Sequence, residues 1–379
     1  MKIEQKRWTE ARGWEPEPPG ELGESAQLVL LFGSTLILKE QKCFREIKDA
    51  YPKAHLFGCS TAGEICGTQV TDDSLIATAI DFEFTQLKGA RINLNEVENS
   101  FQAGDHLARS LDKEGLVHVL VLSDGLKVNG SDLVNGLMRN LPDEVTVTGG
   151  LSGDGERFNE TLVFWDEPPE SGNIAVLGLY GSGLKVGYGS LGGWDPFGPE
   201  RLITRSKGNI LYELDGKSAL ELYKKYLGDH AKGLPATGLL FPLSLRVREG
   251  EAGLVRTILS VNEEEQSMTF AGDVPERAYA RLMKANFDRL IDGAVEAAKV
   301  SYETNGSLSP DLAILISCVG RKMVLRQRIE EEVEGVREVL GDRAILAGFY
   351  SYGEISPFIP GTKCALHNQT MTITTFSEK

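Results

Sequence analysis

The stretch Gly58-Cys59-Ser60-Thr61-Ala62-Gly63-Glu64-Ile65 returns 290 residues later as Gly348-Phe349-Tyr350-Ser351-Tyr352-Gly353-Glu354-Ile355. The same shift aligns residues 40–58 with residues 330–348, and both segments combine a helical pattern with a short apolar strand. Glycine at each end of a turn permits positive φ and lets a ligand approach main-chain N–H groups closely. The chain therefore repeats a unit in which a strand enters a glycine-bounded turn that one glutamate follows.

A weaker third copy lies in the middle of the chain. An apolar strand at 117–123, a helix at 131–141 and a strand at 145–148 precede the glycine-rich segment 149–155. The first copy begins with the apolar strand 28–34 and the last with 312–318. Three β-α-β-β units predict mixed β-sheets covered by helices, an α/β to α+β fold in two domains. The pattern leaves the strand order open.

Two segments outside these units bear on domain organisation. Residues 1–26 hold three prolines and many charges, which predicts a poorly ordered arm or a first polar turn. Residues 189–199 are dense in turn formers and indicate a loop or a domain junction. Trp194 and Phe197 in this junction fit a plug between domains better than an exposed docking site, because tryptophan is usually buried.

Composition excludes several function classes. The net charge of −15 and pI near 5.0 argue against nucleic-acid and anionic-membrane partners, since phosphates would be repelled. The first residues lack the apolar core of a signal peptide and no apolar run has the length of a bilayer span, so we expect a cytoplasmic location and no membrane partner. The five scattered cysteines fit reduced thiols, and the histidines lack metal-ligand spacing.

The twin turns are the predicted ligand site, because a pocket needs a few convergent polar groups on an apolar wall. For an amino-acid-like ligand, a glutamate would meet the ammonium and Arg321 the carboxylate. Two alternatives stay open: each glutamate closes its own turn, or Arg321 forms an ordinary ion pair at the surface. The candidate residues of the turns are Ser60, Thr61, Glu64, Tyr350, Ser351, Tyr352 and Glu354.

Several motifs in order resemble the FIST family of intracellular signalling domains. The first turn, Gly149-Gly150 and the segment Gly192-Gly193-Trp194-Asp195-Pro196-Phe197-Gly198 are similar to the FIST N domain. Ser317-Cys318-Val319-Gly320-Arg321, the second turn and Cys364-Ala365-Leu366-His367-Asn368-Gln369-Thr370-Met371 are similar to the FIST C domain. The resemblance implies FIST N-like residues 27–208, FIST C-like residues 209–379, and a stand-alone sensory protein that binds a small ligand.

The resemblance also implies a cofactor and a partner. Some stand-alone members are haem-based nitric-oxide sensors that regulate a sensor histidine kinase. Haem here would take His367 as axial ligand, or His55 as runner-up, with Arg321 or Lys322 on a propionate. Asn368, beside His367, joins the ligand-binding candidates.

An enzyme acting on a small metabolite is the competing interpretation, with Cys59, Cys318 and Glu64 as active-site groups. A phosphatase-like thiolate site would need arginine at position 324, where the chain has Val324. The segment 149–155 lacks the Gly-Lys-[Ser/Thr] ending of a P-loop. We therefore predict binding without catalysis.

Overall fold

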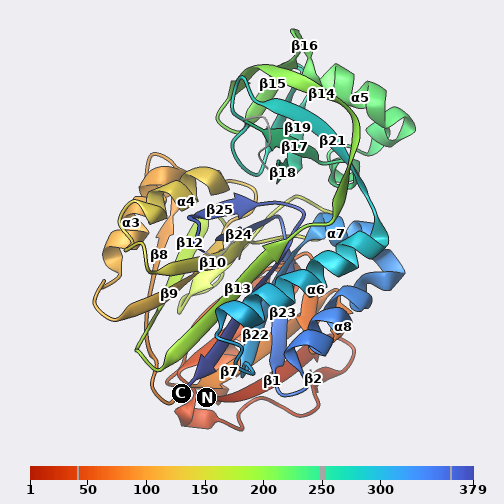
Figure 1. The fold of residues 1–379 in the computed structure, drawn as a ribbon. Coiled ribbons are helices and arrows are strands. Elements are labelled where there is room, and N and C mark those ends of the chain that lie inside the picture. Colours follow the sequence, from red (N-terminus) through yellow and green to blue (C-terminus); the bar gives the residue numbers. More distant parts are fainter. Residues whose placement is uncertain (41, 248–252, 359–360) are drawn as a thin grey trace.

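The computed structural model describes residues 1–40, 42–247, 253–358 and 361–379. It contains three six-stranded sheets that form a body and an eight-stranded sheet that forms a separate head (Figure 1). Helices cover the outer faces of the sheets in the body. The predicted mixed α/β fold in two domains is confirmed.

The three sheets of the body share one central arrangement of strands. In the first sheet, β3 (Leu28–Gly33) runs parallel to β4 (His55–Ser60) and antiparallel to β7 (Ser74–Asp81). The second and third sheets repeat this pairing, as the predicted units require. Their strands are β9 (Leu116–Ser123), β10 (Thr146–Leu151) and β12 (Asn173–Tyr180), then β22 (Leu312–Cys318), β23 (Ile345–Ser351) and β26 (Met371–Glu378).

Each unit begins with a strand that the sequence pattern did not indicate. These strands are β1 (Lys2–Thr9), β8 (Gln86–Asn93) and β13 (Leu184–Leu191), which pair with β7, β12 and β26. The prediction of a poorly ordered arm at 1–26 is wrong for β1, which pairs with β7 along its whole length. The pattern misled because Glu4 and Lys6 are buried with Trp8 on the outer face of the sheet, where Glu4 accepts hydrogen bonds from the N–H groups of Gly20 and Leu22.

After each turn the chain crosses to a neighbouring sheet. β5 (Glu64–Cys66), followed by β6 (Gln69–Thr71), pairs with β23 of the third sheet. β24 (Gly353–Pro357), followed by β25 (Cys364–His367), pairs with β10 of the second. β11 (Val163–Trp165) pairs with β4 of the first. The three exchanges close a ring and bring together the first turn (58–65), the second turn (348–355) and the glycine-rich segment 149–155, which forms a third, middle turn.

Apolar side chains fill both faces of the sheets. One cluster joins the inner faces of all three sheets through residues such as Leu30, Leu120 and Ile314. Outer clusters lie beneath the helices. These helices are α1 (Thr35–Lys39), α2 (Lys42–Ala50), α3 (Ser100–Ser110), α4 (Gly130–Met138), α6 (Phe287–Thr304), α7 (Val319–Leu325) and α8 (Ile329–Leu340). No helix in the described part of the chain is both long and apolar enough to cross a bilayer.

The head is inserted between β13 and α6 and has its own core. The long strand β14 (Trp194–Lys207) leaves the body and β21 (Tyr279–Ala285) returns beside it. A boundary at 208/209, as the resemblance implied, falls inside this head. The remaining elements include β15 (Ile210–Leu214), β16 (Lys217–Ser218), α5 (Ala219–Leu227), β17 (Leu243–Arg246), β18 (Leu254–Arg256), β19 (Ile258–Asn262) and β20 (Ser267–Phe270).

Trp194 lies where the head joins the body. Its ring packs in a buried cluster with Leu290, Val324 and Leu325, and its indole Nε1 donates to the Gln369 carbonyl at 3.1 Å. The predicted plug between domains is therefore confirmed for Trp194 but is wrong for Phe197, whose side chain is 44% exposed.

Candidate functional site

The three turns interlock through main-chain hydrogen bonds. The Ala62 N–H donates to the Tyr350 carbonyl and the Tyr350 N–H to the Gly63 carbonyl, both at 2.8 Å. The Gly153 N–H donates to the Ser60 carbonyl at 2.9 Å, and the Tyr352 N–H to the Leu151 carbonyl at 3.1 Å. The twin turns that the sequence singled out are thus in direct contact, with the third turn beside them.

Glu64 is fixed by its own turn and by the first residue of β7. Its carboxylate accepts hydrogen bonds from the Thr61 hydroxyl and from the N–H and hydroxyl of Ser74, the latter two at 3.1 and 2.6 Å. Burial raises the pKa of Glu64 to about 7, although these hydrogen bonds and nearby Lys322 act in the opposite direction.

Glu354 repeats this arrangement in the second turn. Its carboxylate accepts hydrogen bonds from the Ser351 hydroxyl at 2.6 Å and from the N–H and hydroxyl of Thr370 at 3.1 and 3.0 Å. Burial raises the pKa of Glu354 to about 8. Each glutamate thus closes its own turn, as in the alternative to ligand binding that the sequence left open.

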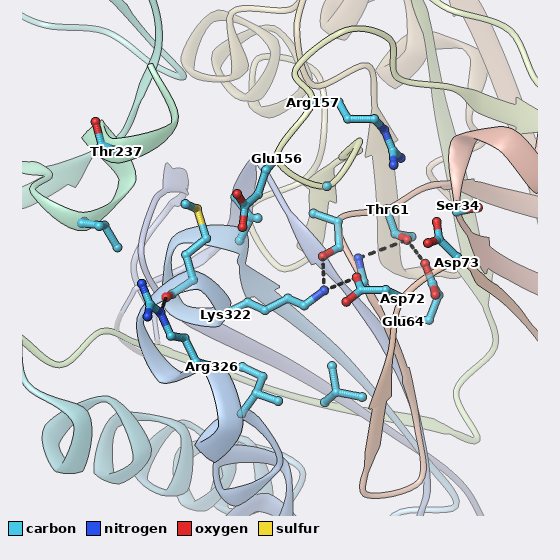
Figure 2. A pocket seen from close by; sticks show the side chains of 18 of the residues that line it. Ser34, Thr61, Glu64, Asp72, Asp73, Glu156, Arg157, Thr237, Lys322 and Arg326 are labelled. Atoms are coloured by element: carbon cyan, nitrogen blue, oxygen red, sulfur yellow. Dashed lines mark hydrogen bonds and ion pairs between the residues drawn. The ribbon is translucent and has the colours of Figure 1, made fainter. Parts of the chain in front are cut away.

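A cavity of about 730 Å³ lies on one side of the interlocked turns (Figure 2). Its walls come from the first turn, the segment 155–157 after the middle turn, the helix α7, and the head segment that carries His230, Thr237 and Leu240. Four acidic and three basic side chains line it, namely Glu64, Asp72, Asp73, Glu156, Arg157, Lys322 and Arg326. The cavity is suited to a small polar ligand that carries charge.

Part of this lining is already paired. Arg157 forms an ion pair with Asp154 at 2.7 Å, and Lys322 pairs with Asp72. Within the described residues, Asp73, Glu156 and Arg326 form no ion pair with another side chain. In Figure 2, Arg326 and Asp73 lie on opposite sides of Lys322.

Ser34 adds a neutral polar group to the lining. It directly follows β3, and only 4% of its surface is exposed. Its Oγ has no hydrogen-bond partner among the described residues, although it lines the cavity. A buried hydroxyl normally has a partner, so this atom has an open position for a ligand.

Lys322 links α7 to the first turn. Its ammonium donates to the Ala62 carbonyl at 2.9 Å and lies 5.7 Å from the centre of the Tyr350 ring. Gly63 leaves room for it, because a Cβ at position 63 would lie 2.4 Å from Nζ. Gly63 also has φ of +131°, a conformation that favours glycine.

Arg321, the predicted carboxylate partner, is fully buried and does not line the cavity. Its Nη2 lies 2.7 Å from Glu332 and 2.6 Å from the Leu290 carbonyl, while Nη1 donates to the Gly192 carbonyl at 3.1 Å. Tyr350 donates its hydroxyl to Glu332 at 2.7 Å. Arg321 and Tyr350 therefore belong to one buried network around Glu332. Arg321 does form an ion pair, but it lies in the core and not at the surface, as the alternative from the sequence had it.

Four other candidates also bond within the protein. Ser60 donates to the Gly153 carbonyl at 2.8 Å, and Ser351 to Glu354. Tyr352 donates to the Gly155 carbonyl at 3.0 Å, and the amide of Asn368 donates to the Tyr352 carbonyl at 3.2 Å. Of the nine predicted ligand-binding residues, the structure places Thr61 and Glu64 in the cavity lining.

Neither histidine predicted for haem faces this cavity. His367 is 2% exposed, its Nε2 lies 2.9 Å from the Ser356 carbonyl, and burial lowers its pKa to about 4. His55 lies at the start of β4, 2.7 Å from Asp166, whose hydrogen bond raises the pKa of the imidazole. Neither imidazole could therefore serve as axial ligand to a haem bound in this cavity.

The two cysteines of the enzyme interpretation are fully buried. Burial raises the pKa of both Cys59 and Cys318, so each is held as the neutral thiol rather than the reactive thiolate. Neither lines the cavity. Of the three active-site groups in the enzyme interpretation, Glu64 is the one that lines the cavity.

Sequence reasoning missed most of the lining. Ser34 and Asp73 lie far apart in the first unit, Glu156 follows the middle turn and Arg326 follows α7, and no local motif connects them. One positional signal was present: Ser34 ends the predicted strand 28–34, and loops at strand ends often carry binding residues. Arg326 has φ of +50°, which no sequence pattern indicated.

Comparison with known proteins adds three findings. An uncharacterized protein of Methanocaldococcus jannaschii is 23% identical over 372 residues, which cover 87% of this chain and 70% of that protein. The crystal structure of cyanuric acid hydrolase from A. caulinodans aligns over 100% of this chain and 99% of its own, with a TM-score of 0.36 and 7% identity. A similarity at that level says nothing about the chemistry of this chain. The FIST N domain model matches residues 27–217 and the FIST C domain model residues 219–357, so the chain belongs to the FIST family.

Proposed function

We propose that this FIST protein is a sensor that binds a small zwitterionic metabolite, such as an amino acid, in the cavity beside the interlocked turns. The observation that carries the proposal is the cavity itself. It combines a buried hydroxyl with an open hydrogen-bonding position, Ser34, and separated charges of both signs that have no ion-pair partner among the described residues.

The residues differ from those that the sequence suggested. Glu64 and Arg321 are engaged within the protein. In their place, Asp73 and Glu156 would receive the ammonium and Arg326 the carboxylate. Charge-assisted hydrogen bonds of this kind are the stronger ones in a partly enclosed site, and they would select ligands that carry both charges.

The bound state would be read by a partner protein, and a sensor histidine kinase is the partner that we propose. The ligand would bias the position of the head against the body, since residues of both line the cavity. Ligand binding without turnover is the mode of action in this proposal.

The test is isothermal titration calorimetry of the purified protein against each of the twenty amino acids, with the matching amines and carboxylic acids as single-charge analogues. We expect stoichiometric binding of one amino acid or a few, and at least about tenfold weaker binding of either analogue. Recovery of the unchanged compound after incubation would separate binding from catalysis. Consumption of the compound would favour the enzyme interpretation instead.

Variants tie that binding to the cavity. Glu156→Gln and Arg326→Met should each weaken binding about tenfold or more, because each removes one charge contact. Glu114→Gln is the matched control, since Glu114 is an exposed carboxylate that does not line the cavity. Equal affinities in all three variants, or no binding by any amino acid or analogue, would refute the assignment.

A further inference from the structure

We propose that Gln369 is a positioning residue that holds the head segment η4 (Ala236–Leu240) against α7 and thereby sets the width of the cavity. Sequence analysis noted this residue only as part of a family motif. In the structure it lies where the head, the body and α7 meet.

The side-chain amide of Gln369 connects the body to the head. Its Nε2 donates to the Leu239 carbonyl of η4 at 2.9 Å and to the Thr257 hydroxyl at 3.2 Å, and both partners belong to the head. Gln369 itself follows β25 in the body. Its carbonyl accepts the hydrogen bond from Trp194, where β14 leaves for the head.

The same amide packs against α7. A Cβ at Gly320 would lie 2.3 Å from Nε2 and 2.5 Å from Oε1 of Gln369, so glycine is required for this approach. Gly320 lies in the first turn of α7, whose Lys322 and Met323 line the cavity. One side chain therefore touches both α7 and η4, two adjoining elements that line the cavity.

Gln369 occupies this position in an unfavourable conformation. It is fully buried, and its φ of +65° is uncommon for a residue other than glycine. The Leu239 carbonyl can only accept, so the NH₂ group must face it, and Oε1 then has no partner among the described residues. Such features persist where the surrounding structure imposes them, and they gather at sites with a specific role.

The consequence concerns the site proposed above, and its bearing on ligand binding rests on that proposed function. The η4 segment carries Thr237 and Leu240, and both line the cavity. Figure 2 shows Thr237 on the opposite side of the view from Asp73. Without the amide of Gln369, η4 loses the hydrogen bond that the Leu239 carbonyl accepts from the body. The wall of the cavity that belongs to the head would then open more often.

Hydrogen exchange of the ligand-free protein tests the contact independently of any ligand. In Gln369→Met, which keeps the length of the side chain but removes the amide, we expect residues 234–241 to exchange about five to ten times faster. The hairpin of β19 and β20 in the core of the head should change less than about twofold. Uniformly faster exchange across the chain would show a general structural role and overturn the inference.

Asn305→Leu is the matched control. Asn305 is also buried, its amide donates to the Ser377 hydroxyl at 2.9 Å and the Leu308 carbonyl at 3.3 Å, and its Oδ1 also lacks a partner among the described residues. All its partners lie in the body. This variant should leave the exchange of residues 234–241 unchanged, and an effect equal to that of Gln369→Met would refute the specific role.

Gly320→Ala alters the same contact from α7, and it provides a second test if Gln369→Met does not fold. The added methyl group would displace the amide, so residues 234–241 should again exchange faster while the Gln369 backbone is kept. If exchange in this segment stays as slow as in the parent protein, Gln369 does not position η4. Neither result depends on whether an amino acid binds.

Discussion

The two turns that share the pattern Gly-x-x-x-x-Gly-Glu-Ile differ in what surrounds them. In the first turn, Glu64 lines a cavity, and Lys322 reaches the Ala62 carbonyl from α7. In the second turn, Glu354 lies in the interior, and Tyr350 joins a buried network with Glu332 and Arg321. Each glutamate accepts from the hydroxyl three residues before it and from the N–H and hydroxyl of one later residue. A repeat therefore conserves the turn, while its neighbours decide whether it faces a ligand or the core.

The largest difference is expected between Arg321 and Lys322, neighbours on α7 that support different turns. Arg321→Met should lower the free energy of unfolding by about 3–5 kcal/mol, because it leaves the charge of Glu332 buried without its partner. Lys322→Met should cost less than about 1 kcal/mol, because its partner Asp72 is largely exposed. Urea denaturation would measure both. Equal losses of unfolding free energy in the two variants would contradict the distinction between the buried ion pair of Arg321 and the partly exposed ion pair of Lys322.

Tyr350 and Ser60 occupy the same position in the two turns and allow a second comparison. Tyr350→Phe should cost about 1.5–3 kcal/mol, since its hydroxyl donates to a charged group. Ser60→Ala should cost about 1 kcal/mol, because Ser60 bonds to neutral main-chain groups. Thermal unfolding followed by circular dichroism would rank them. A larger loss for Ser60→Ala would show that the first turn is the more demanding of the two.

The pH dependence of stability should distinguish the two glutamates. Burial raises the pKa of both above the unfolded value near 4.5, to about 7 for Glu64 and about 8 for Glu354. The folded state then binds more protons, so their contribution is complete below pH 4.5 and is lost as pH rises through those values, by up to about 1.4 kcal/mol per pH unit for each group.

Glutamine mimics the protonated carboxyl group and should remove that loss. Relative to the parent protein, Glu354→Gln should gain stability with rising pH up to about 8, and Glu64→Gln up to about 7. Urea denaturation from pH 5 to pH 9 gives the two difference curves. Curves that are flat in both variants would mean that neither carboxyl group has a raised pKa.

The smallest effect on stability is expected at Ser34. Ser34→Ala should change the free energy of unfolding by less than about 0.5 kcal/mol, because its hydroxyl has no partner to lose in the described structure. The adjacent Thr35→Val should cost about 1–3 kcal/mol, since the Thr35 hydroxyl donates to Asp154 at 2.7 Å. Ser34→Ala should nevertheless weaken ligand binding, which the calorimetric titration would detect. A marked loss of stability would show that the hydroxyl is engaged in the protein.

The sequence by itself determined the repeated unit, because helical and strand periodicity report which faces are buried at short range. It also indicated the glycine-bounded turns, the junction at Trp194 and the family. It did not reveal β1, since Glu4 and Lys6 are buried there through tertiary contacts that override their usual preference for solvent.

Only the tertiary structure decided which polar residues face a ligand. Arg321 and Lys322 are adjacent in sequence, yet one points into the core and the other into the cavity, because successive residues of a helix face different neighbours. The exchange of strands between sheets brings Ser34, Glu156 and Arg326 together from three distant segments. Such a site depends on contacts of long sequence separation, which no local pattern encodes.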